Sequence, residues 1–393
     1  MILIMSSAYL SAEFQVELGA IPPTLLPLGN KKLLEHQVIS LRSRYLDEEI
    51  IVSLPESFQI TESLQKKIER LGVTVIPVPD QFSLSESVLY VLNVSSSEDH
   101  RPITILYGDT YISEYSFLDE SEDAIAVAKA KNSYNWEYID SEHISAHDEN
   151  LVWCGFFTFS DKRLLLKSLA ICRDSFNDAV KYYKSSQKMT YCITEHWQDL
   201  GHVNTYFAAR ANLTTQRAFN DLKIEEGIVV KSGSPQLKIE AEARWFEAIP
   251  NDLRIFSPLY LGQRKIEDSI GYAIEYLPCM PLNELFVHGQ NQVQDWSIIF
   301  SEIKRWFSLA SAQLSINNKE IESEFEKLID EKTFSRIEQY AKEQNISLDT
   351  PCFYAGKELP TIREICTECI DKVKQLASIP GVLHGDLCFS NML

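Results

Sequence analysis

Short apolar runs alternate with amphipathic segments along the first half of the chain. The apolar runs are rich in Ile, Leu and Val, as buried strands are, whereas apolar residues three and four apart predict helices between them. The predicted strands are 2–7, 49–54, 73–78, 103–109 and 151–160, and the predicted helices are 30–44, 61–72, 83–94 and 160–174. Because such alternation builds βαβ units, we expect an α/β fold with a doubly wound, mostly parallel sheet.

Two residues in this pattern are expected to mark helix ends. Gly72 follows the last apolar position of the predicted helix 61–72, and Ser160 precedes the predicted helix 160–174. Glycine closes helices because it accepts a left-handed backbone, and serine caps their first turn.

The pattern changes near residue 205. The stretch 204–223 is helical and then polar, it leads into a β-rich segment at 227–233, and helical periodicity dominates after Trp296. We therefore expect a boundary at about 215, with one domain over 1–215. A second, α+β domain over 216–393 should have a small strand-containing lobe and a mainly helical lobe.

Composition and charge narrow the classes of partner. The 393 residues are 45% hydrophobic and 24% charged, which is typical of globular proteins, and the net charge is −19. A surface this acidic repels nucleic acid and anionic membranes, so we expect neither as a partner. The chain has no run of 18 apolar residues that would predict membrane insertion, and its first residues lack the basic flank of a signal peptide. A cytoplasmic protein is expected, and its oligomeric state stays open.

The final residues carry candidate catalytic chemistry. The sequence 384–391 reads His-Gly-Asp-Leu-Cys-Phe-Ser-Asn, so that Asn391 follows Asp386 by five positions. This is the spacing of a kinase catalytic loop, in which the Asp accepts the proton of the substrate hydroxyl and the Asn binds Mg²⁺.

Two further residues fit the same chemistry. A kinase needs a strand lysine on the α- and β-phosphates and a helix glutamate that fixes this lysine. Lys231 follows an apolar run, and the next helical pattern, 235–250, contains Glu240 and Glu242. Since these two glutamates are about 200° apart around a helix, only one can face the lysine, and we favour Glu240.

Together these features resemble the aminoglycoside/choline phosphotransferase family, whose members keep a kinase fold with His-Gly-Asp in the catalytic loop. The resemblance implies that Asp386 is the catalytic base, that Asn391 binds Mg²⁺, and that Lys231 and Glu240 serve ATP. The family's second metal ligand is an Asp after this loop, and the sequence stops at Leu393. We therefore expect a C-terminally shortened chain whose kinase half is inactive in the 393-residue form.

The first half carries four motifs in order, at 21–42, 104–112, 152–160 and 196–209. They resemble the sugar-phosphate nucleotidyltransferases over about 210 residues. Asp109 follows a predicted parallel strand, at the edge where doubly wound sheets bind nucleotides. The resemblance implies that Asp199, in Trp-Gln-Asp-Leu-Gly, is a second carboxylate and that both bind Mg²⁺ with the triphosphate of CTP or UTP.

The polyphosphate-binding residues differ from those of this family. The family's glycine-rich loop is replaced by 6–19, where the hydroxyls of Ser6 and Ser7 are candidate donors to the triphosphate. Pro23 stands where the family has its activating lysine. Lys31 or Lys32 is the candidate substitute, and the alternative is that both are surface lysines at the start of a helix.

Two functions follow from these resemblances. The first is a bifunctional nucleotidyltransferase and small-molecule kinase that makes a nucleotide-activated precursor for capsule or lipopolysaccharide decoration. Its substrates are small molecules: nucleotides and a sugar phosphate or phosphorylated alcohol. The alternative is a kinase-fold phosphotransferase whose nucleotidyltransferase-like domain is degenerate, binds a ligand and does not catalyse.

Overall fold

The computed structural model describes most of the chain as two compact units. The described residues are 1–95, 102–118, 123–130, 134, 136–139, 150–213, 220–266, 269–312, 318–376 and 380–393. The first unit comprises Met1–Ile239, Leu261–Trp296 and Leu387–Leu393, and the second comprises Glu240–Tyr260 and Ser297–Asp386. The predicted domain boundary at 215 lies outside the described residues and stays a prediction.

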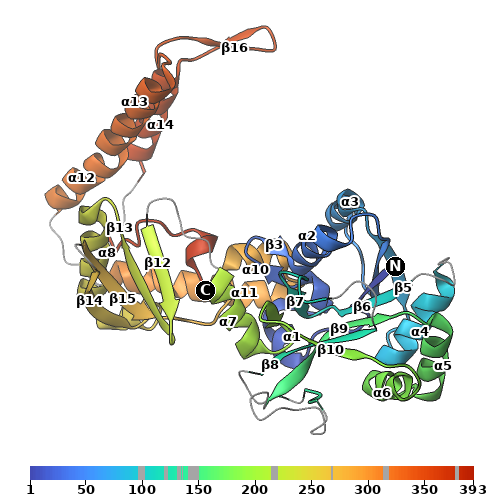
Figure 1. Ribbon diagram of the computed structural model, residues 1–393. Coiled ribbons are helices and arrows are strands. Elements are labelled where there is room, and N and C mark those ends of the chain that lie inside the picture. The colour runs from blue at the N-terminus through green and yellow to red at the C-terminus, as the bar shows by residue number, and fades with distance from the viewer. Residues whose placement is uncertain are drawn as a thin grey trace. The chain divides into compact units, whose positions relative to one another are not determined.

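A seven-stranded sheet forms the core of the first unit (Figure 1). Its strands are β1 (Ile2–Met5), β4 (Ile50–Pro55), β5 (Thr74–Val78), β6 (Ile103–Tyr107), β8 (Ala124–Lys129), β9 (Leu151–Phe159) and β10 (Thr190–Ile193). Their order across the sheet is β10-β8-β9-β6-β1-β4-β5. All neighbouring strands are parallel except at β9, which runs antiparallel to both β6 and β8. The predicted α/β fold with a mostly parallel central sheet is confirmed.

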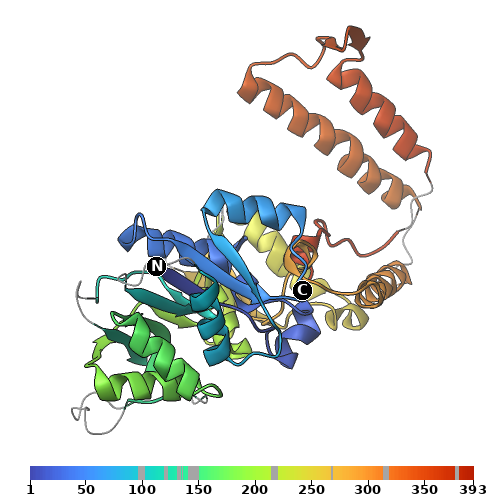
Figure 2. The same cartoon turned by 90° about the vertical axis from the view of Figure 1, so that its right-hand side faces the viewer.

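Helices cover both faces of this sheet, as the view in Figure 2 also shows. Side chains alternate between the faces along a strand, so Leu3 and Ile4 of β1 enter different apolar clusters. One face packs against α4 (Leu84–Val94), α5 (Lys162–Ile171) and α6 (Phe176–Ser186), and the other packs against α2 (Leu33–Arg44) and α3 (Glu62–Leu71). Burial on both faces explains why the strands read as continuous apolar runs.

The helix ends agree with the sequence in one case and differ in another. Gly72 is the C-cap of α3 and has the expected left-handed backbone, with φ of 63°. The cap of α5, however, is Asp161, whose carboxylate accepts a hydrogen bond from the Leu164 N–H, so the prediction of Ser160 was wrong by one residue. The Ser160 N–H donates instead to the buried Asp123, which holds Ser160 outside the helix.

The rest of the first unit contains short helices and a second sheet. Further elements are α1 (Ala12–Leu18), a 3₁₀ turn at Pro23–Leu25, the strand pair β2 (Pro27–Leu28) and β3 (Lys31–Lys32), the strand pair β7 (Thr110–Ile112) and β11 (Trp197–Asp199), α7 (Val203–Leu213), α10 (Leu282–His288) and a 3₁₀ turn at Phe389–Asn391. Four antiparallel strands follow α7 in the order β12-β13-β15-β14, with bounds Asn220–Glu225, Ile228–Gly233, Ser269–Glu275 and Tyr260–Ile266.

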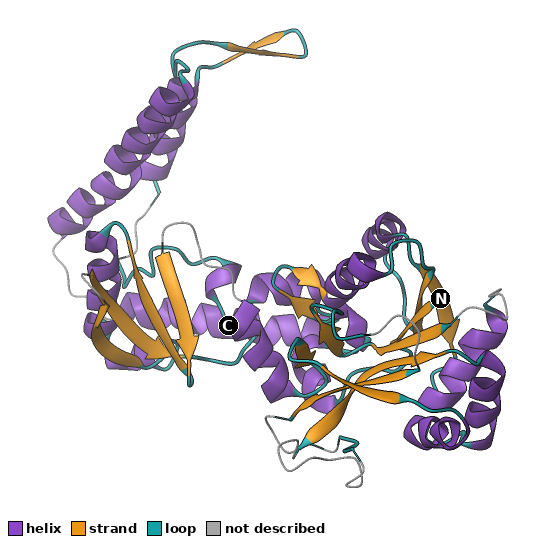
Figure 3. Ribbon diagram, viewed as in Figure 1, coloured by secondary structure: helices purple, strands orange, loops and turns teal. Residues whose placement is uncertain are grey.

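The second unit is mainly helical (Figure 3). Its elements include most of α8 (Gln236–Ala248) and α11 (Val293–Ala312), and all of α9 (Asn251–Arg254), α12 (Asn318–Glu326), α13 (Lys332–Gln344) and α14 (Ile362–Lys374). A π-helical turn at Lys327–Glu331 joins α12 to α13, and a hairpin of β16 (Cys352–Tyr354) and β17 (Lys357–Leu359) precedes α14. Among the described residues, no helix combines the length and apolar character needed to cross a membrane.

Candidate functional site

Asp109 is fixed at the carboxyl end of β6, where the chain passes very close to β1. The Gly108 N–H donates to the Met5 carbonyl at 2.8 Å. A Cβ on Gly108 would lie 2.7 Å from the Ser6 Cβ and 2.8 Å from that carbonyl oxygen, so a larger residue does not fit there. The glycine of Leu-Tyr-Gly-Asp therefore lets β6 turn away from β1 and present the next side chain at the sheet edge.

Asp199 is brought to Asp109 by a short antiparallel strand pair. Asp199 ends β11 (Trp197–Asp199), which pairs with β7 (Thr110–Ile112) so that Asp199 lies opposite Thr110. The pairing continues beyond the strand, because the Leu200 N–H donates to the Asp109 carbonyl at 2.9 Å. Two residues 90 positions apart in the sequence thus become neighbours.

The two carboxylates face the same small space beside Gly201. A Cβ placed on Gly201 would lie 2.4 Å from Asp109 Oδ2 and 3.4 Å from Asp199 Oδ1. One oxygen of each carboxylate is therefore within 3.4 Å of a single point, and only a glycine leaves that point open. The structure brings the two predicted metal ligands together at the carboxyl edge of the sheet.

Three neighbours hold the Asp199 carboxylate in place. His202 Nδ1 lies 2.7 Å from Asp199 Oδ2, the Thr205 hydroxyl donates to the same oxygen at 2.8 Å, and the Gly201 N–H donates to Oδ1 at 3.2 Å. These contacts fix the rotamer, as hydrogen bonds to a metal-binding carboxylate do. His202 and Thr205 were not identified from the sequence. Both residues follow Asp199 closely, by three and six positions, and this spacing could have indicated contacts with its carboxylate.

Aromatic rings surround the histidine. Tyr134 stacks on His202 with ring centroids 3.9 Å apart, and Trp136 meets both His202 and Trp197 edge to face. These ring contacts restrict the motion of the imidazole that contacts Asp199.

The environment changes the acidity of Asp109. Burial, followed by the nearby Asp199 charge, raises the pKa of Asp109 from 3.8 to about 6, although its backbone hydrogen bond and His202 act in the opposite direction. Two carboxylates that repel each other across one open point are a donor set that suits a hard divalent cation such as Mg²⁺. The described residues contain no group of three or more His, Cys, Asp or Glu that could hold a metal ion, so other metal ligands would come from substrate or water.

The predicted serines lie at the end of β1, next to this edge. Ser6 is buried: its N–H donates to Ser53 Oγ at 2.9 Å, and its own oxygen accepts from the Thr24 N–H at 3.0 Å. Ser7 is also buried, with 8% of its surface exposed. The Ser6 hydroxyl thus already serves the protein as an acceptor, and its hydrogen is the part that could serve a ligand. The roles of Ser6 and Ser7 as hydrogen-bond donors to the triphosphate stay predictions.

Gln37 supports the Asp109 loop and was not identified from the sequence. This fully buried side chain donates to the carbonyls of Gly108 and Thr110 at 3.1 and 2.8 Å, and it accepts from the Thr24 hydroxyl at 2.7 Å. It therefore ties the Pro-Pro-Thr segment to the turn that carries Asp109. Gln37 could have been identified from the sequence, because it is a polar residue on the apolar face of the predicted helix 30–44.

The two candidate lysines have different surroundings. Lys31 is exposed on β3, whereas Lys32 is half-buried at the start of α2. Burial and the neighbouring Lys67 lower the pKa of Lys32 to about 8, so it is the more perturbed of the two groups. Which of them serves the triphosphate stays a prediction.

The predicted kinase residues are distributed over both units. In the first unit, Lys231 lies on β13 with its Nζ 5.9 Å from the Tyr272 ring, and Asn391 ends a 3₁₀ turn. In the second unit, Glu240 lies in α8 with its carboxylate 3.7 Å from Arg244, and Asp386 is exposed in a loop. Their catalytic and metal-binding roles stay predictions.

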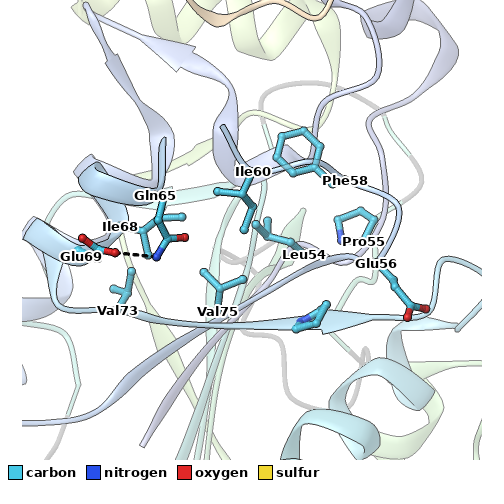
Figure 4. A pocket seen from close by; sticks show the side chains of 11 residues that line it. Leu54, Pro55, Glu56, Phe58, Ile60, Gln65, Ile68, Glu69, Val73 and Val75 are labelled. Carbon is cyan, nitrogen blue, oxygen red and sulfur yellow. Dashed lines mark hydrogen bonds between the residues drawn. The ribbon is translucent and has the colours of Figure 1, made fainter. Parts of the chain in front are cut away.

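The described residues of the first unit also line two pockets that contain neither Asp109 nor Asp199. One, of about 300 Å³, lies between β4, α3 and β5 and is mostly apolar (Figure 4). Leu54, Ile60, Ile68 and Val75 line it, and a hydrogen bond from Gln65 to Glu69 closes one side. The other, of about 130 Å³, contains Lys32 in its wall.

Comparison with known proteins gives structural neighbours only. No protein-family model and no curated protein matches the sequence. A nucleoside-diphosphate-sugar pyrophosphorylase from Vibrio cholerae RC9 matches 53% of this chain and 99% of its own, with 16% identity and a TM-score of 0.45. A UTP-bound UGPase from Acinetobacter baumannii matches 54% of this chain and 92% of its own, with 15% identity and a TM-score of 0.40. An inositol-1-phosphate CTP transferase from T. maritima matches 52% of this chain and 90% of its own, with 15% identity and a TM-score of 0.38.

Proposed function

We propose that residues 1–215 form a nucleotidyltransferase that joins a nucleotide from CTP or UTP to a small phosphorylated compound. The acceptor is a sugar phosphate or a phosphorylated alcohol. The observation that carries this proposal is the convergence of Asp109 and Asp199 on one point at the carboxyl edge of a mostly parallel sheet, where α/β proteins bind nucleotides.

In this proposal the protein binds and orients the reactants. An oxygen of the acceptor's phosphate bonds to the α-phosphorus of the nucleotide, the bond to the β-phosphate oxygen breaks, and pyrophosphate leaves. Mg²⁺, when bound, neutralises phosphate charge and orients the triphosphate. Asp109 and Asp199 would hold it, while His202 and Thr205 fix Asp199. Ser6, Ser7 and Lys31 are the candidate contacts to the phosphates, because Lys32 lines a pocket that contains neither serine nor either Asp.

Pyrophosphate release tests the proposal. The chain is incubated with Mg²⁺, each of the four nucleoside triphosphates and a panel of sugar 1-phosphates. We expect acceptor-dependent release with CTP or UTP and a loss of at least about 100-fold in Asp109→Asn, because the cation loses a charged ligand. Glu114→Gln, at an exposed acid near the same sheet edge, is the matched control and should keep its activity. Absence of release with every pair would contradict nucleotidyl transfer.

One observation favours the alternative of a non-catalytic ligand-binding domain. Side chains fill the segment that follows β1: Leu10 is buried and its N–H donates to the Ile21 carbonyl, while the Tyr9 hydroxyl lies 2.7 Å from Ser57 Oγ. Backbone N–H groups that are already used cannot cradle a triphosphate. Mg²⁺-dependent nucleotide binding without pyrophosphate release would support this alternative over the first proposal.

We propose a small-molecule kinase for residues 216–393, with ATP and Mg²⁺ as cofactors. The order of elements supports it: a strand with Lys231, the helix with Glu240, a strand hairpin, helices, and then Asp386 and Asn391. Formation of ADP in the presence of choline, ethanolamine or sugar alcohols is the test. Turnover that Asp386→Asn abolishes would support the kinase and would overturn the expectation that the 393-residue form is inactive. No turnover with any alcohol would agree with that expectation and would contradict kinase activity of this chain.

The two activities together would make an activated precursor. The kinase would phosphorylate a small alcohol, and the nucleotidyltransferase would couple the product to a nucleotide in the cytoplasm for capsule or lipopolysaccharide decoration. Keeping both sites on one chain raises the local concentration of the intermediate.

A further inference from the structure

The smaller of the two pockets described above lies in the first unit, and neither Asp109 nor Asp199 lines it. Its volume is about 130 Å³, and its wall is built from the start of α2, the start of α3 and the residues around the end of α10. Lys32, Lys67 and His288 are its titratable residues, and none of Asp109, Asp199, Ser6 or Ser7 lines it. We call this space the Lys32 pocket.

The Lys32 pocket is cationic within an acidic protein. The described residues that line it include two lysines and no Asp or Glu, although the chain carries a net charge of −19. Outside the wall, Glu35 accepts from Lys67 Nζ at 2.9 Å and from the Lys32 backbone N–H at 2.9 Å. Within the described part of the chain, the Lys32 amino group has no hydrogen-bond or ion-pair partner. Glu35 therefore forms an ion pair with only one of the two ammonium groups, that of Lys67.

His288 lines the same wall. Its side chain is buried, with 6% of its surface exposed, and its Nδ1 has no hydrogen-bond partner among the described residues. Burial, followed by the charges of Lys32 and Lys67, lowers the pKa of His288 to about 4, against the opposing effect of Glu284 and Glu35. The ring is therefore neutral at pH 7. The positive charge of the wall therefore comes from the two lysines.

The start of α3 forms the other side. Thr61 caps this ten-residue helix, since its hydroxyl oxygen accepts from the Leu64 N–H, and Thr61 and Ser63 both line the pocket. The first N–H groups of a helix lack intrahelical partners and carry the positive end of its dipole, so they favour an anion. Gln59, Thr61 and Ser63 are exposed, which lets solvent reach the pocket.

We propose that the Lys32 pocket binds the phosphate group of a small molecule, with Lys32 and Lys67 supplying charge and the first turn of α3 supplying hydrogen-bond donors. A phosphate matches this wall better than a carboxylate does, because it carries close to two negative charges and three strong acceptor oxygens. The volume exceeds that of a few waters and admits a phosphate with part of its ester group. The site does not depend on nucleotidyl transfer at Asp109.

Thermal unfolding with phosphate ligands tests this site. The chain is titrated with inorganic phosphate and, separately, with glycerol 3-phosphate, at constant ionic strength set by chloride. We expect a concentration-dependent rise in Tm and a Kd at least tenfold weaker in Lys32→Gln and Lys67→Gln. Tighter binding of the ester identifies an esterified ligand, and tighter binding of inorganic phosphate identifies the free ion.

The matched control is Lys66→Gln, one residue from Lys67 on the solvent side of α3, where the side chain pairs with Glu62 and is 61% exposed. This variant should bind phosphate as the unsubstituted chain does. An unchanged Tm with both ligands, or equal Kd values in the Lys32→Gln and Lys66→Gln variants, would overturn the proposal.

A measurement on the unsubstituted chain covers the case in which a Lys32 variant fails to fold. Acetic anhydride modifies uncharged lysine amines, and Lys32, with a pKa of about 8, is reactive at pH 8. Peptide mass spectrometry should show that phosphate slows modification of Lys32 at least fivefold and leaves Lys66 unaffected. Equal rates with and without phosphate would count against the site.

Discussion

At the level of single residues, the central feature is a pair of carboxylates that the fold holds close together although their negative charges repel. Asp109 and Asp199 share the space beside Gly201, and burial with mutual repulsion raises the pKa of Asp109 to about 6. A divalent cation bound between the two carboxylates would attract both of them and so would offset this repulsion.

Replacement of Asp109 should stabilise the chain in the absence of metal. Its pKa rises from 3.8 to about 6 on folding, so the stability that this group contributes is complete below pH 3.8 and is lost as the pH rises through 6. At pH 8 without Mg²⁺, Asp109→Asn should therefore raise the free energy of unfolding by about 3 kcal/mol. Urea unfolding followed by circular dichroism measures this change, and destabilisation by the substitution would contradict the assigned repulsion.

Cation affinity should depend on pH through the same group. Below about pH 6 a proton occupies Asp109 and Mg²⁺ must displace it. Calorimetric titration with Mg²⁺ should give an affinity about tenfold weaker at pH 5 than at pH 7 and nearly constant from pH 7 to 8. Asp109→Asn should remove this dependence. A flat profile in the unsubstituted chain would show that Asp109 does not bind the cation.

A methyl group at Gly201 should block the cation site while both charges remain. The new Cβ would lie 2.4 Å from Asp109 Oδ2, so the carboxylate has to move. We expect Gly201→Ala to weaken Mg²⁺ binding at least tenfold. Gly72→Ala is the control, because it strains a left-handed helix cap at a cost of about 1 kcal/mol without approaching the site. Equal Mg²⁺ affinity in both variants would contradict the placement of the site.

Not all of these residues could be found from the sequence. Asp109 followed from its place after a predicted strand, whereas Asp199 rested on a family resemblance, because 90 residues separate the pair. His202, Thr205 and Gln37 were missed since their contacts depend on the β7–β11 pairing and on the turn after β6. Long-range pairing of three-residue strands leaves almost no periodic signal.

At the level of elements, the sequence was most informative where burial is strongest. β1, β4, β5, β6 and β9 and helices such as α3 appear where the periodicity places them, because the same apolar contacts create both pattern and structure. The buried strand β8 and the helix α6 were not predicted. Helix ends were less predictable: Asp161 caps α5 because Asp123 binds the Ser160 N–H, a contact that no local pattern reveals.

One ion pair between elements should contribute measurably to stability. Arg210 of α7 makes two contacts with Glu284 of α10, at 2.8 and 3.0 Å, and both side chains are nearly buried. Arg210→Met should lower the free energy of unfolding by about 3 kcal/mol, because it leaves a buried carboxylate unpaired. Loss of the exposed Lys66–Glu62 pair should cost at most about 0.5 kcal/mol. Urea unfolding of Arg210→Met and Lys66→Gln measures both changes. Equal losses in the free energy of unfolding would contradict a stabilising role for the Arg210–Glu284 pair.

At the level of the whole molecule, the first unit carries both the acidic pair and the Lys32 pocket, and the proposed kinase residues are divided between the two units. The predicted α/β fold of the first half is confirmed, whereas a kinase fold for residues 216–393 stays a proposal. Sequence patterns could not settle it, because short antiparallel strands and long exposed helices occur in many architectures.

The most direct test of the central claim is the position of a divalent cation in crystals grown with Mn²⁺ and CTP or UTP, located by anomalous scattering. The account predicts one Mn²⁺ peak bonded at about 2.2 Å to an oxygen of Asp109 and an oxygen of Asp199, with the triphosphate completing its coordination. A nucleotide bound with its Mn²⁺ elsewhere, or with no Mn²⁺ in contact with either carboxylate, would contradict it.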